Sequence, residues 1–159
     1  MTAKERVLER ERQRGLLAAQ KVQDCAEMWS GTQLYEQEEN IPGFDAAVAR
    51  MNMLDRPVGF VCRSPQGRVV RLLQKYDSSI YSQEPEQLSA QWGFVWSTDP
   101  AKAKPFVSLA TSPYNRGDCC ISGGRVWRSA QDGNVWEPGT DGAAWEELGT
   151  VEQVREAVE

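Results

Sequence analysis

Histidine is absent from the 159-residue chain, which removes the commonest general base and the commonest zinc ligand. The four cysteines form no CxxC pair, so the usual zinc motifs are missing as well. Acidic residues such as Asp132 and Glu137 lie in turn-rich segments, where carboxylates commonly bond their own backbone instead of flanking a substrate. The sequence therefore predicts no metal, no cofactor and no catalytic residue, and we expect a protein that is not an enzyme.

Long apolar runs and an excess of positive charge are also missing. No run approaches the ~20 apolar residues of a membrane-spanning helix, and residues 1–6 contain no apolar signal-peptide segment. The net charge of −5 and the isoelectric point of about 4.9 are atypical of nucleic-acid-binding proteins. We therefore expect synthesis in a cytoplasm, no membrane or nucleic-acid partner, and reduced cysteines that fill the core.

A charged helical segment opens the chain. Thr2 and Glu5 match a capping box, and no proline occurs before Pro42, so residues 2–29 are predicted to be helical. Their apolar positions follow helical spacing but form a narrow seam, and Gly15 lowers helix stability by ~1 kcal/mol relative to alanine. Such a helix buries too little to be stable alone. It is expected to dock on a partner or to self-associate.

Residues 30–42 resemble a loop, and residues 43–54 predict a second short helix with Phe44 and Met51 on its buried face. Residues 1–50 are therefore predicted to be an arm for assembly. From Arg56 onward, short β-rich runs alternate with Gly, Pro, Asn and Asp turns. The predicted strands are 58–62, 68–76, 93–96, 118–121, 125–130 and 144–148, with a proline-bearing connector at 97–113.

An internal repeat divides the β-rich region. Residues 67–74 (GRVVRLLQ) and 124–131 (GRVWRSAQ) are identical at the Gly, Arg, Val, Arg and Gln positions, and upstream of them Gly59–Cys62 aligns with Gly117–Cys120. Each copy is predicted to form a hairpin followed by a third strand that begins near a tryptophan, Trp92 or Trp145. Three short strands bury one tryptophan and a few aliphatic side chains.

The predicted fold class is α+β. The N-terminal helical arm is followed by two small three-stranded antiparallel β-modules, at 56–97 and 113–149, and by a short C-terminal helix at 151–159 that begins after Thr150. The residues predicted to fill the core of the β-modules are Trp92, Trp145, Trp127, Val69 and Val126.

The order of residues in the second copy carries a family resemblance. It reads Tyr114-Asn-Arg-Gly-Asp118, then Gly123-Gly-Arg-Val-Trp127, then Gln131, then Trp136-Glu-Pro138 and Trp145. This order resembles the small chitin-binding modules of bacterial chitinases, and more closely the variant found in bacteriophage virion proteins. The resemblance covers residues 113–149 well and 57–96 less completely, and the arm lies outside it. It implies a virion location.

The chain departs from that family at the sugar-binding platform. Chitin-binding members resemble one another in a pair of exposed aromatic residues after the second strand, where this chain has Gln131 and Asp132, and Gln74 and Lys75 in the first copy. Other aromatic faces would have to stack on a sugar ring, and loop positions favour such contacts. The candidate ligand-binding residues are Trp136, Tyr114, Tyr81 and Tyr76.

Two functional hypotheses follow. In the first, the chain is a non-catalytic bacteriophage structural protein of tail, fibre or capsid-decoration type, and its arm contacts other virion proteins or further copies of itself. In the alternative, the aromatic residues recognise a host-surface polysaccharide, with weak affinity that many copies strengthen through avidity.

Overall fold

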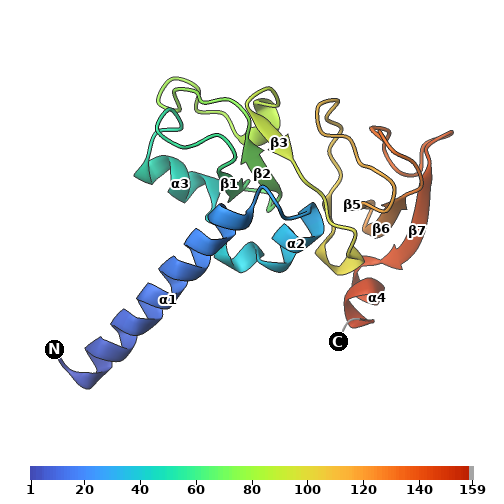
Figure 1. Ribbon diagram of the computed structural model, residues 1–159. Coiled ribbons are helices and arrows are strands. Elements are labelled where there is room, and N and C mark those ends of the chain that lie inside the picture. The colour runs from blue at the N-terminus through green and yellow to red at the C-terminus, as the bar shows by residue number, and fades with distance from the viewer. Residues whose placement is uncertain (158–159) are drawn as a thin grey trace.

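The protein is a mixed α+β molecule, as predicted, with an N-terminal helix that projects from a body of two small sheets (Figure 1). The computed structural model describes residues 1–157. Its helices are α1 (Ala3–Cys25), α2 (Gly31–Glu36), α3 (Phe44–Arg50) and α4 (Val151–Glu156), with 3-10 turns η1 (Glu38–Asn40), η2 (Pro85–Gln87) and η3 (Pro100–Lys102). The short C-terminal helix is confirmed, and residues 158–159 of the predicted tail lie outside the described residues.

The first sheet is antiparallel and contains β1 (Val61–Arg63), β2 (Val69–Leu72) and β3 (Trp92–Phe94) in that order. The second sheet contains β4 (Lys104–Pro105), β5 (Cys119–Ser122), β6 (Arg125–Ser129) and β7 (Trp145–Thr150). The prediction of three antiparallel strands is therefore wrong for the second sheet. A fourth strand, β4, pairs in parallel with β5 from within the predicted connector. Pro105 is tolerated there because an edge strand needs fewer N–H donors.

Strand pairings recur at the positions that the sequence repeat aligns. Cys62 pairs with Val70, and Cys120 pairs with Trp127. At the third strands, Trp92 pairs with Leu72 and Trp145 pairs with Ser129. The aligned strands of the two sheets thus share one register.

The start of each aligned hairpin is fixed by a glycine in the left-handed region. Gly59 has φ +94° and donates its N–H to Leu72 O at 2.8 Å, while Gly117 has φ +97° and donates to Ser129 O at 2.9 Å. A side chain at these φ values is strained, so glycine is the residue that fits both positions.

A central core lies between the two sheets. One face of β2 contributes Val70 and Leu72 to it, and one face of the second sheet contributes Cys120 and Trp127. Two outer clusters cover the remaining faces. The first combines α1, α2 and the other face of β1 and β2, and the second combines η3, α4 and the outer face of β5 and β6. Side chains alternate between the two faces of β2, because Val69 and Val70 lie in different clusters.

The C-terminal turns of α1 belong to the body. Val22 and Ala26 are buried against the first sheet. The Gln23 side chain donates to Val61 O at 2.8 Å and accepts from Val61 N at 3.0 Å, so its amide takes the place of a neighbouring strand. Arg71 donates to the carbonyls of Ala26 and Trp29 just after the helix. The predicted arm of residues 1–50 is therefore not one free segment, because its second half forms part of the core.

Residues 30–42 were predicted to be a loop and instead form α2 and η1. Ser30 accepts from Gln33 N at 3.2 Å, and the Gln33 side chain accepts from Ser30 N at 2.9 Å, which is a capping box. The helix places Tyr35, fully buried, over the first sheet. The Tyr35 hydroxyl accepts from Val69 N at 3.0 Å and donates to Val95 O at 2.9 Å, which bridges β2 to the chain after β3.

Candidate functional site

Two of the predicted ligand-binding residues are exposed. The Trp136 side chain is 54% exposed and Tyr81 is 52% exposed. The Trp136 backbone is held in place, because its carbonyl accepts from Trp145 Nε1 at 2.7 Å and its N–H donates to Asn134 Oδ1 at 3.3 Å. A large aromatic face on a fixed backbone can stack on an apolar ligand surface with little loss of entropy.

The structure places Tyr114 and Tyr76 in the core, so their prediction as ligand contacts is wrong. The Tyr114 ring stacks on Trp96 with 4.1 Å between ring centroids, and it also packs on Phe106 and Trp145. The Tyr76 hydroxyl accepts from Trp92 Nε1 at 3.0 Å. Tyr114 is buried because aromatic rings from both halves of the body surround it, whereas Tyr76 is buried against Trp92 of the first sheet.

The residues predicted to fill the core of the β-modules lie there or at its edge. Trp92, Val69 and Val126 are fully buried, whereas Trp127 and Trp145 are partly buried and pack against the central core. Trp127 Nε1 donates to Ser122 O at 3.0 Å, which satisfies its polar edge inside the hairpin. Asp132, one of the residues that replaces the family's exposed aromatic pair, accepts from Arg116 N at 3.0 Å and fixes a loop.

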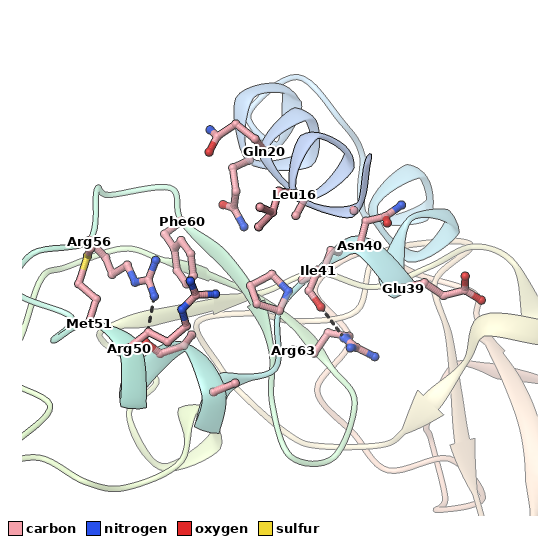
Figure 2. A pocket seen from close by; sticks show the side chains of 16 residues that line it. Leu16, Gln20, Glu39, Asn40, Ile41, Arg50, Met51, Arg56, Phe60 and Arg63 are labelled. Carbon is pink, nitrogen blue, oxygen red and sulfur yellow. Dashed lines mark hydrogen bonds between the residues drawn. The ribbon is translucent and has the colours of Figure 1, made fainter. Parts of the chain in front are cut away.

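A groove of about 630 Å³ lies between α1, α3 and β1, and the sequence did not indicate it. Figure 2 shows Leu16 and Gln20 of α1 on one side of this groove and Arg50, Arg56 and Phe60 on the other. Apolar atoms from Leu16, Ile41 and Phe60 line its walls. Mixed lining of this kind is common in binding grooves.

Three arginines give this groove a positive character. Arg56 stacks over the Phe60 ring at 4.4 Å and donates to Ala47 O at 2.9 Å, and Arg63 donates to Ile41 O at 2.9 Å. None of Arg50, Arg56 and Arg63 forms an ion pair within residues 1–157. Burial, and then the neighbouring Arg50, lower the pKa of Arg56. Glu39 also lines the groove, and guanidinium groups can hold an anionic group there by paired hydrogen bonds.

A second basic feature runs along the outer face of α1. At about 100° per residue, Arg6, Arg10, Arg14 and Lys21 fall on one side of the helix together with Leu17. All five are exposed, and Leu17 is 71% exposed. None of the four basic residues is ion-paired in the described part of the chain. We call this set the basic stripe, and it faces away from Val22 and Ala26.

Three of the four cysteines are shielded from solvent. Cys62, Cys119 and Cys120 are buried free thiols, and burial raises the pKa of Cys119 to about 11 and those of Cys62 and Cys120 well above the usual range. Such thiols are inert at neutral pH. Among residues 1–157, no three Cys, Asp or Glu side chains converge as a metal site, and no helix there has the length and apolar character to cross a membrane.

The chain was compared with protein-family models, with curated proteins and with solved structures. None of the three comparisons finds a match.

Proposed function

We propose that the chain is a non-catalytic bacteriophage structural protein that uses the N-terminal half of α1 for assembly. The observation that carries the proposal is the projection of the first turns of α1 away from the body (Figure 1), with Val7, Leu8 and Leu17 exposed. An isolated helix of this length is marginal in water and exposes apolar surface at a cost. Burial against another chain would remove both penalties, which supports an assembly role.

The rest of the proposal concerns the body. We propose that the two sheets are two copies of one small β-module, fused through the central core. The shared register and the paired glycines at 59 and 117 support this view, as does the sequence repeat. The virion location rests on the resemblance of residues 113–149 to the phage variant of chitin-binding modules, which is an argument from pattern.

Deletion of residues 1–17 tests the assembly role. The remaining chain starts at Ala18 and keeps Val22, Gln23 and Ala26, so we expect its free energy of unfolding to fall by less than about 1 kcal/mol. Multi-angle light scattering should show an oligomer for the full chain and a monomer for the truncated one. Gly15→Ala is the control, because its Cβ meets no atom within 4 Å and alanine strengthens the helix. An oligomer that survives the deletion would refute the assembly role.

Glycan binding is a second candidate, and the exposed ring of Trp136 favours it. Addition of an oligosaccharide, such as a chitin fragment or a host-surface polysaccharide fragment, should then shift the tryptophan fluorescence of the full chain. Trp136→Ala should abolish the shift, while Trp29→Phe, far from the second sheet in sequence, should leave it in place. If the wild-type spectrum does not respond to sugars, Trp136 has another role.

A further inference from the structure

The groove between α1, α3 and β1 is large enough to hold a small molecule. Its volume of about 630 Å³ lies within the range of small-molecule sites, on the order of 300–1,000 Å³. Leu16 and Ala19 of α1 line one wall, and Ala47 and Phe60 line the other. Because burial of apolar surface favours binding, these walls favour a ligand with an apolar body.

Positive charge gathers at one end of the groove. Figure 2 shows Arg50, Arg56 and Phe60 together at this end and Glu39 at the opposite end. The two arginines are close enough to repel each other, because burial and then the charge of Arg50 lower the pKa of Arg56. Within residues 1–157, neither arginine forms an ion pair. Two neighbouring cations without a paired carboxylate attract an anion.

The structural role of Arg56 accounts for only part of this arrangement. Its Nη2 donates to Ala47 O at 2.9 Å in the last turn of α3, and its guanidinium stacks on the Phe60 ring at 4.4 Å. These two contacts fix the side chain. Its Nε is nevertheless buried and has no hydrogen-bond partner among the described residues. Because buried donors are almost always paired, this orphaned N–H is a second, independent sign that the guanidinium lacks an acceptor.

The other charged groups of the groove favour a ligand with a single negative charge. Arg63 donates through Nε to Ile41 O at 2.9 Å, and Figure 2 shows it between Arg50 and Glu39. The Glu39 carboxylate repels a second negative charge at its own end of the groove. A molecule that is charged at one end and apolar along its length therefore fits better than a molecule that is charged at both ends.

We propose that this groove binds a small molecule that joins one carboxylate to an apolar body. The carboxylate lies at Arg50 and Arg56, and the apolar body lies along Leu16 and Phe60. A planar guanidinium matches a carboxylate by two parallel hydrogen bonds, which explains the use of arginine at this end. Binding takes place within one copy of the chain, so it does not depend on the proposed assembly role.

Isothermal titration calorimetry of the full chain with octanoate tests the proposal. Octanoate should bind at one site per chain, whereas 1-octanol, which has the same apolar length without the charge, should bind about tenfold more weakly. Acetate, which has the carboxylate without the apolar body, should give no measurable binding. Equal affinities for octanoate and 1-octanol would show that the arginines hold no carboxylate and would overturn the proposal. The absence of saturable octanoate binding would overturn it as well.

Two matched pairs of variants locate the bound octanoate. Arg50→Gln removes an arginine of the groove, and its control Arg10→Gln removes an exposed arginine outside it. Leu16→Ser changes a groove wall, and its control Leu17→Ser changes the next leucine, which does not line the groove. Arg50→Gln and Leu16→Ser should each weaken octanoate binding on the order of fivefold or more, with unchanged circular dichroism spectra, while both controls bind like the wild type. An equal loss in a variant and its control would mean that octanoate adheres to the surface in general, which would overturn the proposal.

Discussion

Replacement of Tyr35 by phenylalanine is expected to lower the free energy of unfolding by about 2–4 kcal/mol, because two buried backbone groups lose their partner. The hydroxyl bridges Val69 N and Val95 O. A direct backbone hydrogen bond between the same two residues runs from Val95 N to Val69 O at 3.2 Å. No water can take the place of the hydroxyl unless the fully buried site opens. Burial also raises the pKa of Tyr35 far above its usual range, so this hydroxyl stays protonated.

Urea unfolding monitored by circular dichroism measures this effect. The matched control is Tyr81→Phe, whose ring is exposed and should change the free energy of unfolding by less than about 0.5 kcal/mol. Equal stabilities for the two variants would mean that Tyr35 does not join α2 to the first sheet. The structure of residues 30–42 would then need revision.

Truncation of Trp92 to alanine is expected to cost about 3–5 kcal/mol, the usual range for a fully buried tryptophan. The ring packs edge-on against Phe44 at 5.9 Å and against Tyr76 at 6.2 Å, and its Nε1 donates to the Tyr76 hydroxyl. Its loss would open a cavity between α3 and the first sheet and leave Tyr76 without its donor. For a chain of this size, such a loss is a large fraction of the total stability.

Trp136→Ala is the control for Trp92→Ala, because both remove an indole but Trp136 is more than half exposed. Thermal unfolding should show a lower midpoint for Trp92→Ala and nearly the wild-type midpoint for Trp136→Ala. A large stability loss in both variants would indicate that the Trp136 loop is structural, which would also weaken its case as a ligand contact.

Local signals in the sequence predicted where the helices begin and where the six expected strands lie, but the predicted helices at 2–29 and 43–54 run four residues past the ends of α1 and α3. The capping boxes at Thr2 and Thr150 are both present, because each depends on residues three positions apart and on nothing distant. The loop prediction for residues 30–42 was wrong, although Ser30 and Gln33 carry the same signal. A short helix with little apolar periodicity is stabilised by its tertiary contacts, above all by the burial of Leu34 and Tyr35.

The sequence pattern did not predict the contacts between segments that are distant along the chain. The parallel pairing of Lys104 with Cys120 joins a proline-containing stretch to a strand without any local signature. The aromatic cluster around Tyr114 depends on how the two sheets meet, so a residue at the start of a repeat unit was mistaken for a ligand contact.

In the candidate site, too, the local features were predicted and the features that depend on long-range contacts were missed. The exposure of Trp136 followed from its position in a Gly-, Asn- and Pro-rich loop, which local sequence reveals. The groove with Arg50, Arg56 and Arg63 was missed because these residues are spread over α3, a loop and β1, and α1 brings the opposite wall. The basic stripe could have been found from the spacing of Arg6, Arg10 and Arg14 alone, since these residues recur every four positions on a predicted helix.

The assembly role that we propose assigns residues 3–17 of α1 to contact with other chains, while Val22 and Ala26 at the end of α1 belong to the fold. Amide hydrogen exchange of the full chain, measured at low concentration in high salt and at high concentration in low salt, tests this assignment. At high dilution, residues 3–17 should exchange far faster than Val22 and the amides of β2, because none of their side chains is buried in the body. At high concentration they should become protected while β2 stays unchanged. Equal protection of residues 3–17 under both conditions would contradict the account.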